Sequence, residues 1–137
     1  MTDKSAIHEA LIYIMVTVSA VDTAMNDAEL ARIGRLTRFL PVFAGFDQEQ
    51  LIPVSRDCAE ILSRDNGLKS MLSIVAKAVP QRLHDTAYAL AVEVASADMH
   101  VQAEEIRFLQ MLRDALDLDK LTCAAIERNV IARFRSL

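Results

Sequence analysis

One pattern of apolar and acidic residues occurs twice in this 137-residue chain, and it constrains the fold more than any other feature. In each copy an apolar helical stripe ends at an aspartate, a short acidic turn follows, and a second helical stripe begins. The two aspartates, Asp22 and Asp98, lie 76 positions apart, and the same offset aligns both stripes without a gap. The pattern predicts two helical hairpins related by pseudo-symmetry and packed together at the centre of the fold.

The predicted inward positions follow the three-and-four spacing of amphipathic helices. In the first copy they are Ile7, Leu11, Ile14, Val18, Val21, Leu30, Ile33, Leu36 and Leu40. In the second copy they are Leu83, Ala87, Leu90, Val94, Ala97, Ile106, Leu109, Leu112 and Leu116.

The remaining segments also have helical spacing, and only three glycines and three prolines interrupt the chain. We therefore expect an all-α protein of about seven helices, forming a single domain over residues 1–137. The predicted parts are repeat 1 (about 5–40), connecting helices (about 47–79), repeat 2 (about 81–116) and a C-terminal helix (about 118–135). In the connecting part, Pro53 predicts a kink or a helix that begins near Val54. The C-terminal helix offers Leu121, Ala125, Ile126, Val130 and Phe134 for burial.

Composition excludes several functional classes. The formal charge of −4 and the pI near 5.3 argue against nucleic-acid binding, which needs clustered cations. No stretch of 18 apolar residues predicts a membrane span, and the first residues lack the basic region of a signal peptide. Cys58 and Cys123 have neither metal nor redox spacing, so we expect buried, reduced thiols in a cytoplasmic protein.

The acidic turns are the candidate site. The first contains Asp22, Asp27 and Glu29, and the second contains Asp98, Glu104 and Glu105. Carboxylate oxygens are the ligands that Ca²⁺ and Mg²⁺ prefer, and two turns at the same end of the molecule would pool theirs. Neither turn has the spacing of an EF-hand, because the glycine of that loop is absent from both.

A purely structural role is the more common use of such residues. Asn26 is expected to cap the helix that follows it, with Glu29 three positions on to complete a capping box. A glutamate in the first turn of a helix also complements the helix dipole.

No phosphate-binding loop, nucleophile elbow or catalytic triad occurs, so we expect no catalytic residues and no bound organic cofactor. A helical hydrolase or transferase would have only the acidic turns for its chemistry. His8 and His84 correspond under the repeat offset. They are expected at helix surfaces or ends, with a paired proton switch as the alternative.

The run from Val94 to Asp98, followed by Glu104, Glu105, Ile106 and Leu109, resembles the signature of TerB-like domains of bacterial tellurite-resistance proteins. The family's glycine after the aspartate is replaced by Met99 here and by Thr23 in the first copy. The resemblance implies a cytoplasmic, non-enzymatic helical domain linked to tellurite resistance and chemical stress. It also implies metal-binding positions at Asp22, Glu29, Asp98 and Glu105, with Asp27 and Glu104 beside them.

Two partner hypotheses follow. In the first, the acidic turn end binds a divalent cation or a protein. In the second, the domain is a metal-free interaction or scaffold module, which predicts an exposed apolar patch or a two-fold interface between copies of the chain.

Overall fold

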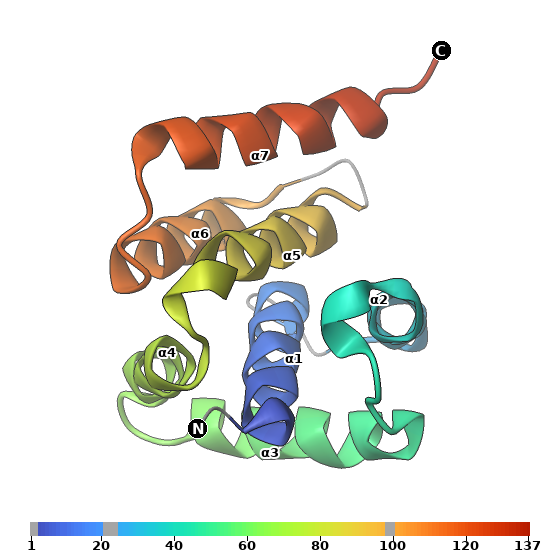
Figure 1. Cartoon of the computed structure of the whole chain (residues 1–137), viewed down its shortest axis with the longest axis vertical. Helices are drawn as coiled ribbons and strands as arrows, with labels where there is room; N and C mark the ends of the chain where they lie inside the picture. The colour runs from blue at the N-terminus through green and yellow to red at the C-terminus, as the bar shows by residue number, and fades with distance from the viewer. Residues whose placement is uncertain (1–2, 21–24, 98–100) are drawn as a thin grey trace.

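The computed structural model describes residues 3–20, 25–97 and 101–137. These residues form seven α-helices and three short 3₁₀ helices, with no strand among them, which confirms the all-α prediction (Figure 1). The α-helices are α1 (Lys4–Ala20), α2 (Asp27–Phe39), α3 (Leu51–Ser63), α4 (Gly67–Ala78), α5 (His84–Ser96), α6 (Ala103–Ala115) and α7 (Lys120–Arg133). The 3₁₀ helices are η1 (Pro41–Phe43), η2 (Gln48–Gln50) and η3 (Gln81–Leu83).

Helix α1 is the core helix of the fold. Every residue from Ala10 to Val18 is buried, because α1 packs against α2, α3, α4 and α5. Figure 1 shows α1 in the middle of these four helices, with α5 crossing one end of the group. A helix that is apolar on all sides is stable in water only when neighbours cover it on all sides.

Helix α5 is the second buried helix, and it connects the group around α1 to α6 and α7. It packs closely on both α1 and α7, and α6 lies beside it. Ala87, Ala91 and Ala95 are all buried and lie four residues apart, on one stripe of the helix. Small side chains allow neighbouring helices to approach closely, so this stripe suits a helix that is packed from several directions.

The two histidines related by the repeat offset both bind backbone carbonyl groups near a helix end. The Nε2 atom of His8 lies 2.9 Å from the carbonyl oxygen of Val42, just beyond α2. The ring of His84 lies between two carbonyl oxygens, with Nδ1 3.1 Å from Leu116 and Nε2 2.9 Å from Val79. Each ring thus ties the first helix of a hairpin to the end of the second. His84 stands at a helix start, as expected, but His8 is buried rather than at the surface.

The connection between the repeats differs from the prediction at Pro53. Helix α3 begins at Leu51, so Pro53 lies in its first turn, where a backbone N–H has no partner within the helix. No later start near Val54 is needed. The turn between α3 and α4 depends on Gly67, because a Cβ atom there would lie 2.3 Å from the carbonyl oxygen of Ile61.

Three predicted core residues are in fact exposed: Ile106, Leu121 and Ala125. Ile106 is 48% exposed and Leu121 is 81% exposed. In α6 the buried side chains are those of Glu105, Phe108 and Leu112, on the face that contacts α4 and α5. Leu112 is thus buried as predicted, whereas Ile106 lies beside that face rather than on it. The extensive helix contacts of α7 are all with α5, and they are made by a stripe that includes Cys123 and Val130. Leu121 lies off that stripe.

Both cysteines are buried thiols, as predicted. Cys58 lies 3.6 Å from the hydroxyl of Thr17, and burial raises its pKa to about 11. None of the helices in the described part of the chain is long and apolar enough to cross a membrane.

We expect Leu11→Ala to lower the free energy of unfolding by about 2–5 kcal/mol, because Leu11 is fully buried in the core helix. Leu121→Ala makes the same chemical change at an exposed position, and we expect it to alter stability by less than about 0.5 kcal/mol. Urea denaturation followed by circular dichroism compares the two variants. Equal losses would show that α1 is not the core helix.

Candidate functional site: the acidic turns and an adjacent groove

The structure places four of the six predicted metal ligands. Asp27 and Glu29 lie in the first turn of α2, and Glu104 and Glu105 lie in the first turn of α6. Asp22 and Asp98 fall outside the described residues. Within residues 3–20, 25–97 and 101–137, no group of three or more His, Cys, Asp or Glu side chains could hold a metal ion. The six-residue cation site therefore stays a prediction.

Helix capping accounts for part of each acidic turn. Asn26 is the N-cap of α2, as predicted, and its Oδ1 atom accepts a hydrogen bond of 2.9 Å from the backbone N–H of Glu29. At α6 the backbone N–H of Gln102 donates to Oε1 of Glu105 at 3.1 Å, and the Gln102 side chain accepts a hydrogen bond from the backbone N–H of Glu105 in return. Glu105 is also buried. It is thus a reciprocal cap, one of the two roles that the sequence left open.

Beside the second acidic turn, a groove runs between α6 and α7. Both helices pack on α5, but they make few contacts with each other, so α5 forms the floor of an open channel. The groove encloses about 320 Å³, which is at the lower end of the range of roughly 300–1,000 Å³ for ligand pockets. Figure 1 shows α7 as the outermost helix, on the side of α5 and α6 away from α3.

The groove is mainly apolar. Its exposed apolar side chains are those of Val101, Ile106 and Ile131, which are 40%, 48% and 50% exposed. Each comes from a different part of the chain: Val101 precedes α6, Ile106 is on α6 and Ile131 is on α7. The other lining residues are Tyr88, Val92, Ser96, Leu109, Gln110, Arg113 and Glu127. Apolar side chains gathered in one groove, unlike single exposed ones, mark an interaction surface.

One end of the groove is polar. The hydroxyl of Tyr88 donates a short hydrogen bond to Oε2 of Glu127, and Nη1 of Arg113 donates to the same oxygen at 3.3 Å. Burial, reinforced by the bond to Glu127, raises the pKa of Tyr88. The phenol therefore stays protonated at neutral pH and acts as a fixed donor that holds α7 on α5.

The other end of the groove borders the second acidic turn. Ser96 and Val101 line this end, and they flank residues 98–100 in the sequence. The two ends are separated along α5, since Tyr88 and Ser96 lie about two helical turns apart. Helix α7 follows α5 in the same direction, because Glu127 bonds Tyr88 and Arg133 pairs with Glu93 further on.

Sequence reasoning missed the groove. Ile131 could have indicated it, because an isoleucine next to Val130 cannot share the single stripe by which α7 packs. No protein-family model, curated protein or solved structure matches this chain. Its function is therefore inferred from its residues and their geometry.

The capping role of Glu105 predicts that Glu105→Ala lowers the free energy of unfolding by about 1 kcal/mol in buffer containing EDTA. Its exposed neighbour provides the matched control, and we expect Glu104→Ala to have an effect below about 0.5 kcal/mol. Urea denaturation measures both. Equal stability of the two variants would show that the cap formed by Glu105 does not stabilise the fold.

The same assay tests the cation hypothesis. If the acidic turns hold Ca²⁺, Mg²⁺ or Mn²⁺, millimolar metal stabilises the wild-type protein, and Asp22→Asn and Asp98→Asn each reduce this gain. If added metal does not change the stability of the wild-type protein, the cation hypothesis is excluded.

Proposed function

We propose that this chain is a non-enzymatic, TerB-like interaction domain of the cytoplasm, linked to tellurite resistance and chemical stress, that binds a partner protein in the α5–α6–α7 groove. The observation that carries the partner-binding part is the cluster of exposed apolar side chains in that groove, beside the second acidic turn. The link to tellurite and stress is supported by the resemblance of residues 94–109 to the TerB signature.

The shape of the groove favours an amphipathic helix as the bound segment. Two walls, α6 and α7, stand on a floor formed by α5. A helix placed in such a channel presents side chains at positions i, i+3 or i+4, and i+7 to the floor, and apolar side chains there would cover Ile106 and Ile131. A protein surface that buries these isoleucines gains the transfer free energy of their exposed area.

The charge beside the groove favours a basic residue at one end of that helix. Glu104 is exposed in the first turn of α6, and Asp98 belongs to the adjoining turn of the sequence. At the other end, Arg113 and Glu127 already neutralise each other. The partner helix would therefore be oriented, with its lysine or arginine at the Val101 end.

A divalent cation at the acidic turns is the second candidate function, and it rests on the duplicated carboxylates of the sequence. The two functions are compatible, because a bound cation would alter the charge that the partner meets at the Val101 end. A second copy of this chain is the alternative occupant of the groove, and it would make the protein a homo-oligomer.

We expect Ile106→Asp to reduce capture of the partner at least tenfold, because it places a charge on the apolar wall of the groove. The tagged protein would be expressed in its source cells, grown with and without sublethal tellurite, and retained proteins would be quantified by mass spectrometry. Ile52→Asp is the matched control, since Ile52 is 50% exposed on α3 and does not line the groove.

A partner retained by wild type and by Ile52→Asp, but lost with Ile106→Asp, supports the proposal. Light scattering on the purified variants tests self-association in parallel. If Ile106→Asp retains the same proteins as wild type, or if Ile52→Asp loses them equally, the groove is not the binding surface.

A further inference from the structure

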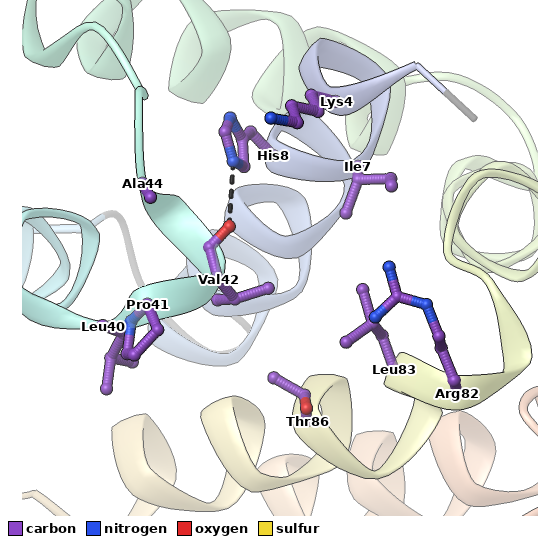
Figure 2. Close-up of a pocket in the computed structure, with 10 residues that line it drawn as sticks. All are labelled: Lys4, Ile7, His8, Leu40, Pro41, Val42, Ala44, Arg82, Leu83 and Thr86. Carbon is purple, nitrogen blue, oxygen red and sulfur yellow. Dashed lines mark hydrogen bonds between the residues drawn. The ribbon is translucent and has the colours of Figure 1, made fainter. Parts of the chain in front are cut away.

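A second cavity lies where three segments that are distant in the sequence meet. The start of α1, the corner between α2 and η1, and the residues from η3 into α5 surround it (Figure 2). Its volume is about 550 Å³, within the range of small-molecule pockets. It shares no lining residue with the α5–α6–α7 groove.

The charged side chains that line this cavity are cationic. Lys4 comes from α1 and Arg82 from η3, and no aspartate or glutamate of the described residues joins them. Neither cation forms an ion pair with a carboxylate anywhere in residues 3–20, 25–97 and 101–137. Most lysines and arginines of the described residues share this property, since the ion pairs there involve only Arg64, Arg113 and Arg133. Lys4 and His8 also line a neighbouring cavity, which includes Glu9 and Asp47.

The rest of the lining is mostly apolar. Figure 2 shows Ile7, Val42 and Leu83 around the cavity, with Lys4 beside His8 and with Arg82 and Thr86 on the side of η3 and α5. Ile7 is buried, and Val42 and Leu83 are partly buried. Neighbouring residues therefore hold these three side chains in place, and the apolar lining is pre-formed. The ring of His8 is fixed by its bond to the carbonyl group of Val42, which holds the α2–η1 corner against α1.

We propose that this cavity binds a small organic carboxylate with an apolar body. The carboxylate lies between Lys4 and Arg82, where the planar guanidinium group can donate two parallel hydrogen bonds to it. The hydrocarbon part lies against Ile7, Val42 and Leu83, and the hydroxyl of Thr86 provides a further donor. This ligand site does not depend on the partner proposed for the groove.

The test uses octanoate as the probe and the full chain labelled with ¹⁵N. We expect saturable chemical-shift changes centred on Ile7, Val42, Leu83 and Thr86 at concentrations up to about 10 mM. Lys4→Gln/Arg82→Gln should weaken octanoate binding about tenfold, since it removes two solvent-exposed cations that would pair with the carboxylate. Lys69→Gln/Arg128→Gln removes two exposed cations elsewhere and should leave the affinity unchanged.

Two further probes separate the contributions of charge and of the apolar body. Octanol, which lacks the charge, and inorganic phosphate, which lacks the apolar body, should each bind at least about tenfold more weakly than octanoate. Absence of saturable shifts with octanoate would overturn the proposal. Equal binding of phosphate, or equal weakening by both double variants, would also overturn it, because recognition would then be of charge in general.

Discussion

Burial of two apolar helices against each other, α1 and α5, determines the rest of this structure. Neither helix has a polar face wide enough to meet water, so each requires neighbours on several sides. Helix α1 obtains them from α2, α3, α4 and α5. Helix α5 has α1 on one side and only α6 and α7 on the other, and these two helices hardly touch each other. The groove is thus a consequence of uneven coverage of the two central helices.

The helical architecture could be predicted from the sequence because its causes are local. Apolar spacing identified the seven helices, and capping residues such as Asn26 identified where some of them begin. Periodicity also gives the buried face of a helix, but only when one neighbour covers it. The repeat offset transferred the inward face of α2 to α6, yet α6 buries Phe108 rather than Ile106, because its neighbours lie in a different direction.

The candidate sites were less predictable, since they depend on residues far apart in the chain. The acidic turns are visible in the sequence, and the role of Glu105 as a cap was one of the two roles considered. The groove combines α5, α6 and α7, and the cationic cavity is lined by both Lys4 and Arg82. No local pattern marks residues that meet only after the core has formed. Isolated features such as Ile131 indicate at most that a side chain lacks an obvious neighbour.

Native-state hydrogen exchange tests the central claim, that α1 and α5 together form the most stable unit of the fold. Amides of residues 11–18 and 87–95 should exchange slowest, with a common opening free energy equal to that of global unfolding, and α7 should exchange earlier. If α1 or α5 instead exchanged as readily as α7, their mutual burial could not be the interaction on which the fold depends.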